Sequence, residues 1–126
     1  MKIENSDIVI VGSGVAGLIC ALTLSKKFKI ILLTKKKIQD SNSYLAQGGI
    51  SVCRGKEDRE EYIEDTLIAG HYKNDKRAVE ILVDESEEAV NTLIENGVKF
   101  TGDKKGLFYT REGGHRKFRI LYCEDQ

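Results

Sequence analysis

The sequence is poor in cysteine, and the few cysteines that it has are widely spaced. Cys20, Cys53 and Cys123 lie 33 and 70 residues apart, so the chain has no CxxC pair. Disulfide-held secreted domains carry many cysteines, and structural zinc sites need closely spaced ligands. We therefore expect neither a disulfide scaffold nor a metal site, and the cysteine content fits a reducing, cytoplasmic environment.

The sequence also lacks a net charge and a long uninterrupted apolar run. Its 20 Lys and Arg residues balance 20 Asp and Glu residues, which excludes an overall basic field that would bind nucleic acid regardless of base sequence. Residues 8–25 form the longest apolar stretch without a charge, but three glycines and Ser13 interrupt it. The stretch begins too close to an acidic N-terminal segment to be a secretory signal, and we expect no membrane span.

What the sequence does contain is enough for a folded domain. With 126 residues, of which 40% are hydrophobic and 32% charged, the chain can form the core of one ordinary domain. Residues 7–11 and 29–34 are short apolar runs, and residues 16–28 between them carry apolar side chains at helical spacing. This order predicts a parallel βαβ unit whose strands are buried on both faces.

The spacing of apolar residues in the middle of the chain predicts helices. Apolar positions indicate one helix over residues 58–69, ended by Gly70, and a longer helix that begins after Asn74 or Asp75 and runs to Asn96. The many acidic side chains of this half predict solvated helix faces, with electrostatic steering as the alternative.

Short strands are predicted near the end of the chain. Residues 98–101 and 107–110 alternate weakly around a turn, which indicates a hairpin, and residues 118–122 predict a strand at a sheet edge without a neighbour. The predicted fold class is α/β, with an incomplete Rossmann-like βαβ core, a helical insertion and a small β-hairpin.

A GxGxxG motif lies between the first predicted strand and its helix. Gly12 permits a tight turn, Gly14 lets the backbone approach a pyrophosphate, and Gly17 lets the helix pack closely on the sheet. The helix N-terminus would offer free N–H groups and the positive end of its dipole to the phosphates. This context favours a dinucleotide site, and a Gly-rich strand–helix corner without a ligand is the alternative.

The second strand ends without the acidic residue that binds ribose hydroxyls in many dinucleotide sites. Thr34 and Lys35 stand there instead. A hydroxyl can still bond a ribose, and a lysine can lie near phosphate or adenosine, whereas a strand end that is merely polar is the alternative. The departure weakens an NAD assignment more than an FAD assignment.

Two further segments concentrate polar groups and glycines. Residues 42–50 predict a loop that could wrap a flat polar ligand or, equally, form an ordinary connection. Residues 110–115, TREGGH, set a guanidinium, a carboxylate and an imidazole around two glycines, and Arg119 follows. Such groups can grip a small anion and guide its protons, although an arginine–glutamate pair on a turn is more often a solvated ion pair.

Taken in order, the segments GSGVAGL, SNSYLAQGGI, YIEDTLIAG, NGVKF, TREGGH and RIL resemble the flavoprotein family that contains L-aspartate oxidase, succinate dehydrogenase and fumarate reductase. The resemblance extends from Ile8 to Leu121 and is strongest to the oxidase branch. It implies that residues 1–126 are the N-terminal part of an FAD-binding domain, with the capping and C-terminal helical domains absent. The chain would then be a fragment that is inactive by itself.

The resemblance also implies roles for individual residues. Glu112 would orient the amino group of the substrate, and His115 and Arg119 would lie near the dicarboxylate site. The first glycine-rich segment would line the pyrophosphate, the end of the second strand the adenosine half, and the next polar segment the flavin end. The implied cofactor-binding set is Gly12, Ser13, Gly14, Val15, Ala16, Gly17, Thr34, Lys35, Asn42, Ser43, Tyr44, Leu45, Ala46, Gln47, Gly48 and Gly49.

Two positions separate members of the family. In many succinate dehydrogenases and fumarate reductases a histidine that matches Asn42 carries the flavin covalently, so FAD is expected to be non-covalent here. Phe118 stands where the oxidases usually have a second arginine, which affects local anion binding and not the family assignment.

The reaction implied by the resemblance is FAD-dependent oxidation of L-aspartate to iminoaspartate in de novo NAD biosynthesis. The implied partners are L-aspartate or another C4 dicarboxylate, O₂ or fumarate as electron acceptor, and quinolinate synthase, without nucleic acid or membrane. Two alternatives stay open. One is a soluble fumarate reductase or succinate dehydrogenase-type flavoprotein, and the other is a non-catalytic nucleotide-binding remnant.

Overall fold

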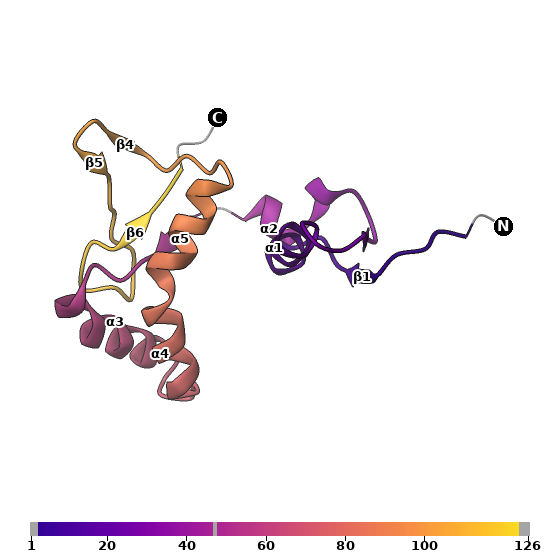
Figure 1. Cartoon of the computed structure of the whole chain (residues 1–126). Helices are drawn as coiled ribbons and strands as arrows, with labels where there is room; N and C mark the ends of the chain where they lie inside the picture. The colour runs from indigo at the N-terminus through magenta and orange to yellow at the C-terminus, as the bar shows by residue number, and fades with distance from the viewer. Residues whose placement is uncertain (1–2, 47, 124–126) are drawn as a thin grey trace. The chain divides into compact units, whose positions relative to one another are not determined.

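The computed structural model describes residues 3–46 and 48–123 (Figure 1). It divides into two compact units, Met1–Gln47 and Gly48–Gln126, which are described separately below. In the part of the chain that the structure describes, no helix has the length and apolar character needed to cross a membrane.

The first unit is built on a βαβ arrangement. Strand β1 (Ile8–Val11) leads through helix α1 (Val15–Leu24) to strand β2 (Ile30–Leu33), and the two strands pair in parallel with Ile8 opposite Ile30. A short 3₁₀ turn, η1 (Ile38–Asp40), and helix α2 (Asn42–Leu45) follow. The parallel pair and its crossover helix confirm the predicted Rossmann-like core.

Within the described part of the first unit, helix α1 covers one face of this small sheet. The Cγ2 atom of Ile10 lies close to Gly17 of α1, and both Ile8 and Ile10 are half-buried. Val9 and Val11 point to the other face and are 54% and 82% exposed. The prediction of strands buried on both faces is therefore wrong within this chain, because neighbouring strand residues alternate between faces and the first unit places its helix on one of them.

The second unit contains three helices, and two of them pack around an apolar cluster. Helices α3 (Lys56–Ala69) and α4 (Lys76–Asp84) lie against each other, and α5 (Ser86–Glu95) follows α4 (Figure 1). The buried cluster between α3 and α4 consists of Tyr62, Ile63, Leu67, Val79 and Val83. The first helix ends at Gly70 as predicted, and Asp75 caps α4 by accepting the Ala78 N–H at 3.1 Å.

The single long helix predicted up to Asn96 is wrong, because the helix breaks at Glu85. The Ser86 hydroxyl donates to the carbonyl oxygen of Val83 at 2.7 Å and accepts the backbone N–H of Cys53 at 2.9 Å. A buried serine that bonds a distant segment competes with the helical hydrogen-bond ladder at this point. The apolar periodicity of the sequence continues across Glu85, so the periodicity does not indicate the break.

Two antiparallel pairs complete the second unit. Strand β3 (Ile50–Ser51) pairs with β6 (Ile120–Leu121), and β4 (Gly102–Asp103) pairs with β5 (Gly106–Leu107) in the hairpin. The hairpin is confirmed, with its paired residues closer to the turn than predicted. The expectation that the strand near residues 118–122 would lack a neighbour is wrong, since β3 supplies one.

Candidate functional site

The glycine-rich turn of the first unit has the geometry that a bound pyrophosphate needs. Gly12 adopts a φ of +112°, a backbone conformation that side chains other than glycine rarely tolerate. A Cβ atom on Gly17 would stand 2.2 Å from the carbonyl oxygen of Gly12, so α1 could not keep its present contact with the turn. Gly12 is thus required by its backbone conformation, and Gly17 by the close approach of helix and turn, as the motif predicts.

The positive end of the α1 helix dipole is not neutralised by an acidic side chain in the first turn. Gly14 is the N-cap and supplies no side-chain cap, and no acidic residue occupies the first turn. The backbone N–H of Val15 donates to the Ser43 hydroxyl at 3.0 Å, and that hydroxyl comes from α2. The donor set therefore combines helix N–H groups with one serine hydroxyl, which fits an anionic oxygen.

A pair of hydroxyls joins the glycine-rich turn to the end of β2. Ser13 is buried, and its Oγ lies 2.9 Å from Oγ1 of Thr34. Val15, Ala16 and Lys35, which are also predicted to contact the cofactor, are exposed. The structure thus brings a residue predicted to line the pyrophosphate next to the strand end predicted to face the adenosine half.

The segment after residue 41 differs from the predicted loop at its start. Residues 42–45 form one helical turn, α2, which the Ser41 hydroxyl caps by accepting the Tyr44 N–H at 3.2 Å. Side chains of Asn42, Ser43, Tyr44, Leu45 and Ala46 are exposed, and Gln47 lies outside the described residues.

Gly48 and Gly49 belong to the second unit. A Cβ atom on Gly49 would stand 2.3 Å from Cγ2 of Ile120 and 2.4 Å from the carbonyl oxygen of Leu121. The close approach of this backbone to β6 is therefore one reason for a glycine at position 49. The assignment of both glycines to the flavin end stays a prediction.

The second unit carries the TREGGH segment on a closed loop. Thr110 and Ile120 exchange two backbone hydrogen bonds, of 2.8 and 3.1 Å, which close the base of the loop. Glu112 lies on an exposed turn, where its carbonyl oxygen accepts the His115 N–H at 3.2 Å, and Gly114 takes a φ of +88°. His115, in contrast, is half-buried and turned toward α3.

Beneath this loop lies a buried charged cluster. Arg119 has no exposed surface, and its Nε and Nη2 donate to the two carboxylate oxygens of Asp58 at 3.1 and 2.6 Å. Its Nη1 donates to Asp65 at 2.6 Å and to Nδ1 of His115 at 3.0 Å. Arg116 adds a side-chain bond and a backbone N–H bond to Asp65. We call Asp58, Asp65 and Arg119 the buried ion cluster.

The electrostatics of the cluster keep its members ionised. Burial alone would raise the pKa of Asp58 and of Asp65. Hydrogen bonds from Arg119 and from backbone N–H groups lower both pKa values by more than burial raises them, so each carboxyl titrates below its ordinary value. Burial alone would lower the pKa of Arg119, and the two carboxylates raise it above its ordinary value. The cluster is therefore a matched set of buried charges whose members depend on one another.

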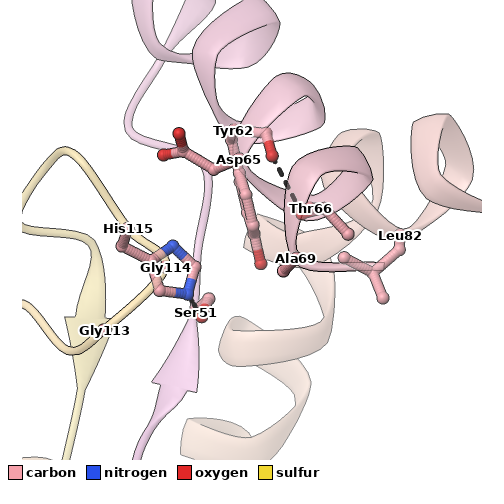
Figure 2. Close-up of a pocket in the computed structure, with 9 residues that line it drawn as sticks. All are labelled: Ser51, Tyr62, Asp65, Thr66, Ala69, Leu82, Gly113, Gly114 and His115. Atoms are coloured by element: carbon pink, nitrogen blue, oxygen red, sulfur yellow. Dashed lines mark hydrogen bonds between the residues drawn. The ribbon is translucent and has the colours of Figure 1, made fainter. Parts of the chain in front are cut away.

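A pocket of about 270 Å³ lies beside this cluster, between the TREGGH loop and α3. Figure 2 shows His115 and Ser51 on one side of the Tyr62 ring and Ala69 and Leu82 on the other. The ring of His115 meets that of Tyr62 edge-on, with centroids 5.8 Å apart, and its Nε2 lies 3.2 Å from the Ser51 hydroxyl. Burial raises the pKa of the Tyr62 phenol more than the hydrogen-bonded Ser51 hydroxyl lowers it. The pocket thus combines hydrogen-bonding groups, among them the Asp65 carboxylate, with apolar walls.

The structure brings His115 and Arg119 into contact and adds two residues that the sequence does not single out. The expectation of a solvated acidic face is wrong for Asp58 and Asp65, because both are buried. Their spacing gives a signal: positions 58, 62 and 65 share one helix face, so an acid stands on either side of the buried Tyr62. Because Arg119 is fully enclosed by these carboxylates, its predicted contact with a substrate stays a prediction.

Comparisons with known proteins agree with the geometry of the turn. Residues 7–126 match the family model described as FAD binding domain. The chain is 49% identical over 120 residues to an L-aspartate oxidase of Clostridium perfringens, and 47% identical over 123 residues to one of Clostridium acetobutylicum.

These alignments cover 95% and 97% of this chain but only 27% and 28% of the relatives, so the chain spans about a quarter of their length. Among solved structures, E. coli quinol fumarate reductase FrdA is similar, with a TM-score of 0.83 and 26% identity. That match covers 96% of this chain and 22% of the other.

Proposed function

The chain belongs to the family of FAD binding domains, and from this membership we propose that residues 1–126 form the N-terminal part of the FAD-binding domain of an L-aspartate oxidase. The observation that carries the proposal is the identity of nearly half of all aligned positions with two such oxidases, over almost the whole chain. The glycine-rich turn, with its free helix N-terminus, supports the cofactor part of the proposal.

Non-covalent FAD would be held by the glycine-rich turn and by the polar segments that follow it in the sequence. The turn of Gly12, Gly14 and Gly17 would receive the pyrophosphate, with Ser13 and Ser43 as hydroxyl donors beside it. Thr34 and Lys35 would face the adenosine half, and residues 42–49 the flavin. When bound, FAD supplies the acceptor for the two electrons that the substrate loses.

The substrate would be L-aspartate, which loses two electrons and two protons to become iminoaspartate. Glu112 would orient the amino group, because its exposed carboxylate can form a charge-assisted hydrogen bond with an amine. His115 would lie near a substrate carboxylate, because its Nε2 bonds the Ser51 hydroxyl and both residues line the same pocket. Glu112 cannot bind the carboxylates itself, since it carries the same charge.

The electrons would pass to O₂, giving hydrogen peroxide, or to fumarate, giving succinate. Iminoaspartate hydrolyses readily in water, so we expect an enzyme that consumes it without delay. Quinolinate synthase in de novo NAD biosynthesis is the partner that the oxidase assignment implies.

A second candidate function is fumarate reduction without L-aspartate oxidation. It is favoured by the similarity in structure to quinol fumarate reductase FrdA, at 26% identity. Asn42 cannot form the covalent flavin bond of many such enzymes, and it occurs at the exposed start of α2. This residue favours the oxidase but is compatible with a reductase that binds FAD without the bond.

One experiment separates the two functions. The purified protein that contains this chain is supplied with L-aspartate and O₂, and peroxide release is measured; it is then supplied with fumarate and a reduced dye. We expect peroxide release with L-aspartate, and we expect Glu112→Gln to raise KM for L-aspartate more than KM for fumarate. Fumarate reduction without any oxidation of L-aspartate would reject the oxidase in favour of the reductase.

A further inference from the structure

His115 is held by a hydrogen bond at each of its two ring nitrogens. Nδ1 lies 3.0 Å from Nη1 of Arg119. Nε2 lies 3.2 Å from the hydroxyl of Ser51, and Figure 2 shows Ser51 beside the His115 ring. The ring also packs edge-on against Tyr62. Its position is therefore fixed by three neighbours from β3, α3 and the end of its own loop.

The partners of the ring decide which nitrogen carries the proton. A guanidinium has only donors and stays charged, so Nδ1 of His115 must be the acceptor of the Arg119 bond. In the neutral ring the proton then sits on Nε2, which donates to the Ser51 oxygen. A neutral histidine in water interconverts between both tautomers, so this arrangement selects one of them.

Arg119 cannot move away from this position without breaking the buried ion cluster. Asp58 takes two of its N–H groups and Asp65 a third, and no part of the side chain is exposed. Its guanidinium carbon also lies 4.8 Å from the centre of the Tyr62 ring. Planar, bidentate pairing of this kind is specific to arginine and is not reproduced by lysine.

We propose that Arg119 is a positioning residue for His115: held by Asp58 and Asp65, it fixes the His115 ring in the tautomer protonated on Nε2 and so directs a hydrogen donor toward Ser51 and the pocket. The role differs from direct contact with a ligand, because Arg119 acts only through His115. The two aspartates act one step further away, by holding the guanidinium.

This selection gives the hydrogen bonds beside the pocket one direction. Arg119 donates to His115 and His115 donates to Ser51, so the Ser51 hydroxyl keeps its own proton for another acceptor. Because Ser51 lines the pocket, that acceptor would be an oxygen of a bound molecule, such as a carboxylate or a carbonyl. That this acceptor belongs to the substrate rests on the proposed function, whereas the tautomer of His115 does not.

The test uses the whole chain, with neither cofactor nor substrate. Its two histidines, His115 and the exposed His71, are labelled with ¹⁵N, and NMR is recorded well above the ordinary histidine pKa of about 6.5. We expect His115 to show one unprotonated Nδ1 and one protonated Nε2, while His71 shows averaged signals of both tautomers. A protonated Nδ1 or averaged signals at His115 would overturn the proposal, whatever activity the protein has.

A pair of matched variants tests whether Arg119 selects the tautomer of His115. Arg119→Lys keeps a positive charge between the aspartates but loses the planar fork, so we expect His115 signals to shift toward those of His71. Arg59→Lys makes the same change in a half-exposed pair with Asp84 and should leave the His115 signals unchanged. Unchanged His115 signals in Arg119→Lys would overturn the proposal, and if that variant does not fold, the tautomer of the unmodified chain decides.

Discussion

The guanidinium of Arg119 and the carboxylate of Asp58 form two hydrogen bonds, of 3.1 and 2.6 Å, across 61 residues of sequence. Both side chains are buried, so neither charge is compensated by water. The pair joins α3 to the segment just before β6, and thereby fastens the TREGGH loop to the helical part of the second unit.

Removal of one carboxylate from this cluster should strongly destabilise the second unit. Asp65→Ala leaves the buried Arg119 with one carboxylate fewer, and loss of one partner in a buried ion pair costs about 3–5 kcal/mol. The free energy of unfolding, measured with denaturant, tests this. Asp84→Ala is the matched control, because Asp84 forms its pair with Arg59 at the surface and should change stability far less. Equal effects of the two substitutions would contradict a structural role for the cluster.

The same carboxylates predict how stability depends on pH. Asp58 and Asp65 titrate below their ordinary pKa of 3.8 in the folded chain, so in acid the unfolded chain binds more protons than the folded one. Their contribution is complete above that value and is lost as pH falls through the folded pKa. We expect the free energy of unfolding to be steady near about pH 5 and to drop toward about pH 3. Asp65→Asn should flatten this drop, and an unchanged slope would exclude Asp65 from it.

The sequence was sufficient to predict those elements whose cause is local. The βαβ unit follows from two apolar runs around a helical pattern, and the turn at Gly12 follows from the glycine spacing. The break at Glu85 could not be predicted in this way. It depends on Ser86 bonding the backbone of Cys53, a contact that crosses 33 residues and leaves the helical periodicity unchanged.

In the candidate site, too, features with a local cause were predictable and features that depend on distant contacts were not. His115 and Arg119 stand four residues apart, so a shared location was predictable, and the structure places them 3.0 Å apart. The local sign of burial at Asp58 and Asp65 is weak: they share a helix face with Tyr62, but acids on a helix are ordinarily solvated. Their partner enters from another segment, and only the tertiary fold shows that the two charges meet an arginine.

Substitution of Gly17 should damage the dinucleotide site by moving α1. In Gly17→Ala the new Cβ would stand 2.2 Å from the carbonyl oxygen of Gly12, which is a backbone atom and cannot rotate away. We expect overpacking to cost about 1–3 kcal/mol and FAD affinity to fall as the helix is displaced. Gly113→Ala is the control, since a Cβ there meets no atom within 4 Å. Flavin fluorescence measures binding, and undiminished affinity in Gly17→Ala would contradict the placement of the pyrophosphate at this turn.

The hydroxyl of Ser43 gives the sharpest test of how α1 binds an anion. It accepts the Val15 N–H at 3.0 Å, which leaves its own proton free to donate to a phosphate oxygen. Ser43→Ala removes this donor, and loss of one hydrogen bond to a charged group, worth about 1.5 kcal/mol, should weaken FAD binding about tenfold. Ser25→Ala is the matched control at the other end of the same helix, where the hydroxyl donates to the Leu22 carbonyl oxygen at 3.0 Å. Tighter binding in Ser43→Ala would instead mean that Ser43 occupies an N–H group that the phosphate needs.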